Sequence, residues 1–292
     1  MSRRVWPNGA RLALSIVVNV EEGSELSIAD SDSGPEPVDE LGVTLKKPVR
    51  NYGNESNYRY GLKAGAPRVM RLLEERNLRA TFTAAAVSLE RAPELTQRIV
   101  AGSHEVCAHG WRWVHQFRMD EAAERDFIRK AVVSIEQTTG KRPHGWLSRY
   151  LTTGNTRRLL VEEGFTYHMD DYSDDHPFWD AVDGKPILIL PYAIDSNDMK
   201  MWADPSYTPA DWLQYAIDSF EWLYREGANQ PRMMSLGVHL RIIGRPGRIG
   251  YFEKFLDHVL RHEDVWVATR LEIARHWAEK NSYRSREVGA SR

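Results

Sequence analysis

Short apolar runs alternate with longer amphipathic segments along nearly all of the 292-residue chain. Brief apolar, β-branched runs predict buried strands, and apolar residues that recur every three or four positions predict helices. The expected strands are residues 12–20, 80–86, 105–108, 145–148, 165–169, 186–190, 233–238 and 265–268. The expected helices are residues 62–76, 92–100, 120–140, 155–163, 208–227 and 252–260, with a closing helix that ends near Lys280.

This alternation predicts an α/β fold with a parallel sheet and crossover helices. At this length a closed or nearly closed β/α barrel is the expected form. We expect a single domain over residues 1–292, with a polar tail that frays from about residue 281. Residues 23–57 show no periodicity and are expected to form a long loop, of the kind that is usually functional or disordered.

Polar side chains stand where almost every expected strand ends. In such barrels the active site lies at the carboxyl ends of the strands. The polar residues at these ends are Asn19, Glu21, His109, Arg149, Asp170, Asp171, Asp198 and His239. Chance could place two or three ionisable residues at strand ends, but it is a poor explanation when nearly every strand has one. The pattern therefore predicts an active-site cleft.

Composition limits the partners and the compartment. The chain has 39 basic and 41 acidic residues and a net charge of −2, which gives no reason to expect nucleic acid or a membrane surface as partner. Cys107 is the single cysteine, so no internal disulfide forms and a reducing compartment fits. No apolar stretch approaches the ~20 residues of a membrane span, and no cleavage site follows the first apolar run. We expect a cytoplasmic, soluble protein.

Several long motifs carry a family resemblance. They are Asn19-Val-Glu-Glu-Gly23, His104-Glu-Val-Cys-Ala-His-Gly-Trp-Arg-Trp113, Arg142-Pro143, Asn155-Thr-Arg-Arg158, Asp195-Ser-Asn-Asp198 and His239-Leu-Arg-Ile-Ile-Gly-Arg-Pro-Gly-Arg248. With these motifs the chain resembles the polysaccharide deacetylase (NodB-homology) superfamily, and more closely the branch of the metal-independent bacterial allantoinase. The resemblance implies a deformed barrel of seven or eight β/α units, hydrolysis of non-peptide C–N bonds, and a homo-oligomer such as a dimer or tetramer.

The resemblance also raises the question of a metal. Deacetylases of this superfamily bind a divalent ion through an acidic residue after the first strand and two histidines spaced i, i+4. Here the histidine positions hold His109 and Trp113, and indole has an N–H donor but no lone pair for a metal. We therefore expect no metal and no other cofactor. The alternative, zinc or another divalent metal held by Glu21 or Glu22, His109 and one distant ligand, stays open.

Absence of a metal would narrow the substrate. Bound zinc lowers the pKa of water to ~7, whereas a side-chain acid or base contributes only ~10²–10⁴-fold. That suits an activated carbonyl better than a plain acetamide. The predicted function is ring-opening hydrolysis of a small cyclic amide: a ureide, hydantoin or imide. The alternatives are a metal-dependent N-deacetylase of a carbohydrate or other acetylated amine, and a catalytically inactive binding protein on the same scaffold.

Three residues are the predicted catalysts. Glu21 would act as base or position the water, and His109 would act as base or proton shuttle beside the carbonyl. By resemblance His239 takes the position of the general acid, where a neutral histidine near its ordinary pKa would protonate the leaving nitrogen.

The predicted substrate contacts surround these three. They are Asn19, Trp111, Trp113, Arg149 and Arg241. Asn19 would orient Glu21 or donate to the substrate, and the arginines would clamp carbonyl or carboxylate oxygens unless they form structural salt bridges. The tryptophans would wall the pocket or pack in the core. Asp171 and Asp198 are expected to be scaffold carboxylates.

Two departures from the allantoinase pattern leave the substrate open. Residues 58–61 read Tyr-Arg-Tyr-Gly where that pattern has glutamate at the second position, so Arg59 would favour a more acidic ligand. The segment after Trp146 also lacks the expected glycine beside Arg149 and is one residue longer.

Overall fold

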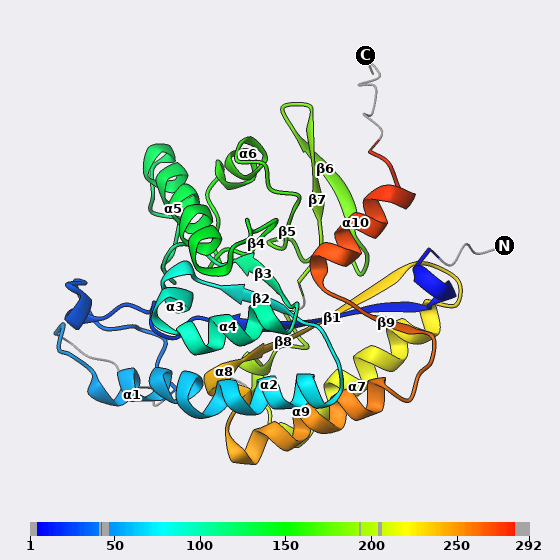
Figure 1. Ribbon diagram of the computed structural model, residues 1–292, viewed down its shortest axis with the longest axis horizontal. Helices are drawn as coiled ribbons and strands as arrows, with labels where there is room; N and C mark the ends of the chain where they lie inside the picture. Colours follow the sequence, from blue (N-terminus) through cyan, green and yellow to red (C-terminus); the bar gives the residue numbers. More distant parts are fainter. Residues whose placement is uncertain (1–4, 41, 43–46, 193, 204–205, 284–292) are drawn as a thin grey trace.

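A curled sheet of nine strands organises the molecule in the computed structural model, which describes residues 5–40, 42, 47–192, 194–203 and 206–283. The strand order is β6-β7-β5-β4-β3-β2-β1-β8, with β9 also paired to β1. Neighbouring strands are parallel except β6 and β7, which are antiparallel. Helices flank the sheet on its outer sides (Figure 1). This confirms the deformed β/α barrel, although it is a curled half-barrel and not a closed one.

The strands match most of the apolar runs. Their bounds are β1 Leu12–Val20, β2 Thr81–Ala84, β3 Glu105–Ala108, β4 Gly145–Trp146, β5 Tyr167–His168, β6 Phe178–Val182, β7 Lys185–Ile189, β8 Arg232–His239 and β9 Val265–Val267. Strands β4 and β5 are shorter than expected. Strand β6 was not predicted, although the Asp183-Gly184 turn that joins it to β7 is a hairpin signal: both residues have positive φ.

The helices cover the sheet. Their bounds are α1 Tyr52–Tyr60, α2 Ala66–Glu75, α3 Ala86–Arg91, α4 Pro93–Ala101, α5 Glu121–Thr139, α6 Thr156–Glu162, α7 Pro209–Glu226, α8 Leu240–Ile243, α9 Pro246–Val259 and α10 Arg270–Lys280. Asp120 and Thr208 cap α5 and α7 as predicted. Residues 23–57 were expected to form one long loop, but α1 begins at Tyr52 within that segment. The side chain of Asn51 caps the start of α1 by accepting from the N–H of Asn54.

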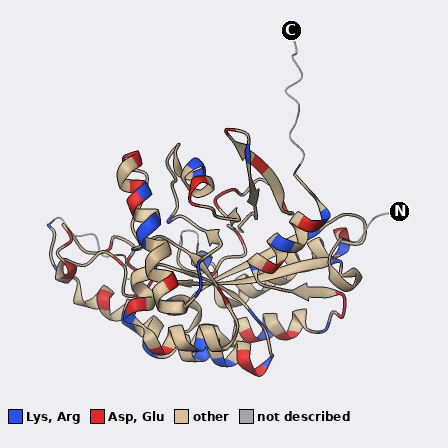
Figure 2. Ribbon diagram, turned by 45° about the horizontal axis from the view of Figure 1, so that its top comes forward, with Lys and Arg blue, Asp and Glu red and all other residues tan. Residues whose placement is uncertain are grey.

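Charges of both signs are interspersed along the outer helices (Figure 2). In the described part of the chain, no helix combines the length and apolar character needed to cross a bilayer. Most of the tail that was expected to fray from about residue 281 lies outside the described residues.

Strand β1 lies at the centre of the sheet and is buried along all nine residues. One apolar cluster fills the space between sheet and helices, including Leu14, Phe82 and Phe255. A second, including Trp6, Val17 and Tyr167, packs against the other face of the sheet. Because both faces are covered, β1 is apolar except at Ser15 and Asn19, as expected of a buried parallel strand.

A close approach of two backbones fixes the segment that follows β8. The π-helical turn Gly61–Gly65 packs against α8, and a Cβ on Gly65 would lie 2.0 Å from the carbonyl oxygen of Leu240. Gly244 meets the same turn, because its Cβ would lie 2.3 Å from the Cα of Gly65. The position of α8, which begins directly after His239, therefore depends on the absence of a side chain at Gly65.

We expect Gly65→Ala to force α8 away from the turn. Overpacking of this kind costs about 1–3 kcal/mol, which urea denaturation would measure as a lower midpoint. Gly154, beside which a Cβ meets nothing within 4 Å, supplies the control variant Gly154→Ala. Equal midpoints for both variants and the wild type would contradict this account of α8.

Candidate active site

The three predicted catalytic residues come together at the carboxyl edge of the sheet. Glu21 follows β1, His109 follows β3, and His239 ends β8. Oε1 of Glu21 lies 3.3 Å from Nε2 of His239 and 3.5 Å from Nε2 of His109. All three side chains are almost completely buried. The structure thus gathers one carboxylate and two imidazoles, while their catalytic roles stay predictions.

Positive charge surrounds the Glu21 carboxylate. A terminal nitrogen of Arg241 donates to Oε2 at 2.6 Å, and His239 lies beside Oε1. Burial alone would raise the pKa of Glu21. The charges of His239 and Arg241, with a hydrogen bond from His239, outweigh burial and hold the pKa well below its ordinary value. Glu21 is therefore ionised at neutral pH.

His239 stands between two carboxylates. Its Nδ1–H donates to Oδ1 of Asp198 at 2.7 Å, and its backbone N–H donates to Oδ2 of Asp198 at 2.8 Å. Burial would lower the pKa of His239, but Glu21 and Asp198 together raise it to about 10. The expectation of a neutral His239 was therefore wrong, because the sequence did not reveal that two acids flank the ring. Asp198 is a scaffold carboxylate, as expected, and it orients His239.

Both ring nitrogens of His109 are engaged. Nδ1 lies 2.7 Å from the carbonyl oxygen of Leu147, which can only accept, so Nδ1 carries the proton. The indole N–H of Trp113 donates to Nε2 at 3.1 Å and occupies its lone pair. Gly110 lets the chain turn so that Trp113 reaches His109. Its φ of +90° favours glycine, and a Cβ at this position would lie 2.6 Å from the ring of Phe127.

The donor set of the metal position therefore fits an ion poorly. Neither nitrogen of His109 has a lone pair to offer while Trp113 is in place, and Oε2 of Glu21 is paired with Arg241. Glu22 is also engaged: it accepts from the backbone N–H of Arg241 at 3.0 Å and of Glu21 at 3.1 Å. Burial raises the pKa of Glu22 to about 7.

The hydrogen bonds of Asn19 differ from those predicted. Both amide protons are used, one donated to the hydroxyl of Tyr192 at 3.0 Å and one to the carbonyl of Val238 at 3.1 Å. Its oxygen accepts from Thr83 at 2.7 Å. With its hydrogen bonds satisfied, Asn19 ties β1 to its neighbours and has no free donor for a substrate.

Arg149 also departs from its predicted role. Its guanidinium forms a buried two-point ion pair with Glu36, at 2.5 and 3.0 Å, and donates to the carbonyl of Trp113 at 2.6 Å. It stacks over the indole of Trp113 at 3.7 Å. This is the structural salt bridge that was the alternative for Arg149. Glu36 was missed because it lies in a segment without periodicity, 113 residues before its partner.

The two tryptophans differ. The ring of Trp113 is buried beside His109, whereas Trp111 packs against the outer core, and Nζ of Lys130 on α5 lies 5.1 Å from its ring. Trp111 therefore takes the alternative given for the tryptophans, which is packing against the core. Successive residues after a glycine turn do not keep the alternation of a strand, so the sequence could not separate the two.

Arg241 keeps hydrogen-bonding capacity for a ligand. It is 1% exposed and lies over the ring of Tyr58, 4.5 Å from its centre. Among the described residues, its Nε and one terminal nitrogen have no hydrogen-bond partner. Buried donors without partners are costly, so a carbonyl or carboxylate oxygen beside Glu21 would satisfy them.

The remaining acidic candidates lie outside this group. Asp170 accepts from the backbone N–H of Ser148 with both oxygens, and burial raises its pKa to about 6. Asp171 pairs with Arg157 at 3.4 Å, as expected of a scaffold carboxylate.

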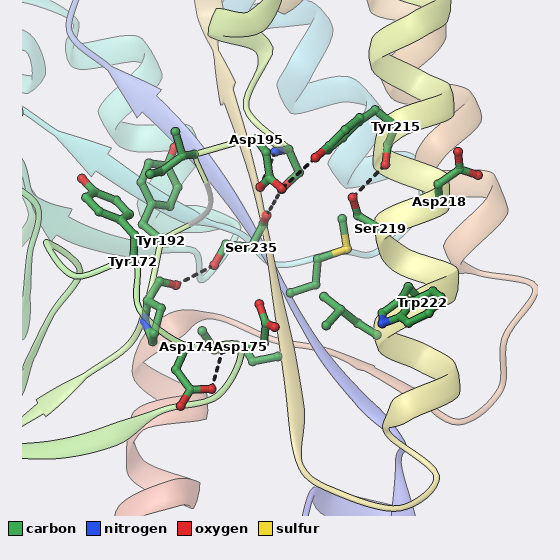
Figure 3. A pocket seen from close by; sticks show the side chains of 16 residues that line it. Tyr172, Asp174, Asp175, Tyr192, Asp195, Tyr215, Asp218, Ser219, Trp222 and Ser235 are labelled. Carbon is green, nitrogen blue, oxygen red and sulfur yellow. Dashed lines mark hydrogen bonds between the residues drawn. The ribbon is translucent and has the colours of Figure 1, made fainter.

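A separate cavity of about 670 Å³ lies between β8, residues 191–192 and 194–196, and α7 (Figure 3). Its polar lining includes Tyr192, Asp195, Tyr215 and Asp218. None of Glu21, His109 and His239 lines it, so this cavity is distinct from the candidate active site.

A buried carboxylate thus lies beside an imidazolium at the strand ends of a curled β/α half-barrel. The chain belongs to the polysaccharide deacetylase family, whose model matches residues 57–168. A Schizosaccharomyces pombe protein named "Putative polysaccharide deacetylase" is 33% identical, over 96% of this chain and 94% of its own. The chain is thus a hydrolase of the class that acts on carbon–nitrogen bonds other than peptide bonds.

Solved structures of similar proteins support the family assignment. The crystal structure titled PuuE allantoinase superposes with a TM-score of 0.91 and 40% identity, covering 96% of this chain and 94% of that one. A Pseudomonas aeruginosa PAO1 structure titled as a probable polysaccharide deacetylase has the same TM-score and identity, covering 96% and 95%.

The charge on His239 predicts how stability depends on pH. A histidine whose pKa is raised by folding contributes stability that is complete below its unfolded pKa of ~6.5 and is lost as pH rises through the folded value of about 10. We expect the urea midpoint of the wild type to fall between pH 6.5 and 9.5 by more than that of His239→Asn. Parallel pH curves for the two proteins would contradict a charged His239.

Proposed function

We propose that this protein opens the ring of a small cyclic amide, such as a ureide, hydantoin or imide, by general acid–base catalysis without a metal ion. The observation that carries the proposal is the indole N–H of Trp113 on Nε2 of His109, which takes the lone pair a metal would need. The similarity to the structure titled PuuE allantoinase supports an allantoin-like substrate.

The reaction follows from the charges at the site. Glu21 removes a proton from water, whose oxygen attacks the carbonyl carbon. The unpaired donors of Arg241 bind the carbonyl oxygen as negative charge develops on it. The C–N bond then breaks, and the imidazolium of His239 gives its proton to the leaving nitrogen. The product is one open-chain molecule that carries a carboxylic acid at one end and an amide or urea N–H at the other.

Proton return is direct. After the reaction Glu21 holds a proton and His239 is neutral, and the two groups lie 3.3 Å apart. Transfer of the proton from Oε1 to Nε2 restores the ion pair. His109 lies 3.5 Å from the same oxygen, but Leu147 and Trp113 engage both of its ring nitrogens, so it carries no proton in this cycle.

The low pKa of Glu21 makes it a weak base until substrate arrives. A ligand that engages Arg241 and His239 draws away the charges that hold this pKa down. Burial then dominates and raises the pKa toward the working pH, where a general base is effective. Substrate binding thus turns Glu21 into an effective general base.

The proposal leaves allantoin itself open. Arg59, expected to favour an acidic ligand, is exposed on α1 and pairs with Glu55 at 3.9 Å, so it is a surface residue. The unpaired donors of Arg241 are better placed to select a substrate oxygen. The cytoplasmic location, the homo-oligomer, and the absence of nucleic-acid and membrane partners stay predictions.

A panel of hydantoins, cyclic imides, allantoin and acetylated sugars would test the proposal. We expect turnover of a cyclic amide that survives chelation and dialysis. Glu21→Gln and His239→Ala should each lower kcat/KM by ~10²–10⁴-fold, the usual contribution of a general acid or base.

Asp171→Asn is the matched control, because it removes a strand-end carboxylate that pairs with Arg157 away from the three residues. It should leave kcat/KM unchanged. Loss of activity on chelation with recovery on adding Zn²⁺, or turnover of acetylated sugars alone, would instead favour the metal-dependent deacetylase.

A further inference from the structure

Helices α7 and α9 pack side by side below the sheet in the view of Figure 1. Two histidines and a glutamate meet where they pack. His258 lies in the last turn of α9, His262 follows one turn later, and Glu221 faces them from α7. Their possible ligand atoms all lie within 4.8 Å of one another. We propose that these three side chains bind a divalent transition-metal ion, preferably Zn²⁺, at a site separate from the active site.

The hydrogen bonding of His262 leaves its Nε2 facing the carboxylate of Glu221. Its Nδ1 lies 3.1 Å from the carbonyl oxygen of His258, which can only accept, so Nδ1 carries the proton. Nε2 of a neutral His262 then presents a lone pair to Oε1 of Glu221 at 3.4 Å. Two electron pairs that face each other repel unless a cation lies between them. A backbone carbonyl on the far nitrogen is also the usual outer partner of a metal-bound histidine.

The distances suit zinc. Tetrahedral zinc with bonds of ~2.0–2.2 Å places its nitrogen and oxygen ligands roughly 3.3 Å apart. The separation of Glu221 from His262 already matches, at 3.4 Å. Nε2 of His258 lies 2.7 Å from the same oxygen and needs to open by about half an ångström as its proton leaves.

Packing holds the two imidazoles in place. Phe220 meets both rings edge-on, at 5.6 Å for His258 and 4.9 Å for His262. Tyr224 meets His262 in the same way at 4.8 Å. Ligands whose rotamers are already fixed lose little entropy on coordination. The negative carboxyl end of α9 also favours a cation at this point.

The cluster remains open to solvent. The side chains of Glu221, His258 and His262 are 44%, 22% and 20% exposed. An ion can therefore enter without unfolding, and water completes its coordination. Since the ligands come from two helices, binding joins α7 to the end of α9 and stabilises the folded state by linkage.

Isothermal titration of tag-free, chelator-treated protein with Zn²⁺ alone tests this site. We expect one ion per chain and a higher Tm on addition of Zn²⁺. The double variant His258→Ala/His262→Ala should lose affinity by more than the roughly 10–100-fold typical of removing an outer partner. Glu221→Gln, which keeps the size of the side chain, should weaken binding.

His176→Ala is the matched control, because His176 is 32% exposed and lies 3.5 Å from Asp174 without a second histidine ligand in the described structure. It should bind Zn²⁺ as the wild type does. No saturable binding by the wild type, or equal binding by the double variant, would overturn the site.

The ring-opening activity is tested separately. If catalysis is metal-free, the double variant keeps its turnover while losing the bound ion. If chelation abolishes turnover in the wild type and the double variant alike, the proposed function fails while the α7–α9 site stands on its binding data.

Discussion

The ionised carboxylate of Glu21, buried against Arg241 and His239, is the interaction on which the rest of the site depends. A carboxylate without water is costly unless it is paired, and here it is paired twice. Each partner is fixed in turn, His239 by Asp198 and Arg241 by the backbone contact of its N–H with Glu22. Removal of any one member leaves a buried charge without compensation. The end of β1, the end of β8 and the turn at Asp198 are therefore held in one arrangement.

The indole of Trp113 sets this site apart from one that has a second histidine at the same position. A histidine at this position would offer a second lone pair, whereas the indole donates its N–H into the lone pair of His109. The ring also supports the stacked guanidinium of Arg149. At this position a hydrogen bond stands where a second imidazole ligand could be. Under the proposed function, stabilisation of the developing charge therefore falls to Arg241 and His239. Those groups suit a carbonyl that is already electrophilic.

Much of the fold could be predicted from the apolar pattern, because β1 and β8 are buried strands made mostly of apolar residues. The meeting of Glu21, His109 and His239 also followed, since parallel strands end at one edge. Contacts between segments far apart in the sequence could not be predicted in the same way. Arg149 finds Glu36 across 113 residues, and Asn19 is satisfied by Tyr192 and Val238. The charge of His239 needed knowledge of both flanking acids, which only the folded chain provides.

The protonation of His239 tests the central claim most directly. Nitrogen-15 NMR of histidine-labelled protein, with the His239 signals assigned by their absence in His239→Asn, reports the proton on each ring nitrogen. The buried ion pair predicts that both nitrogens are protonated at pH 8 and that the ring loses one proton only near pH 10. A ring that loses its proton near the ordinary histidine pKa of ~6.5 would contradict the account.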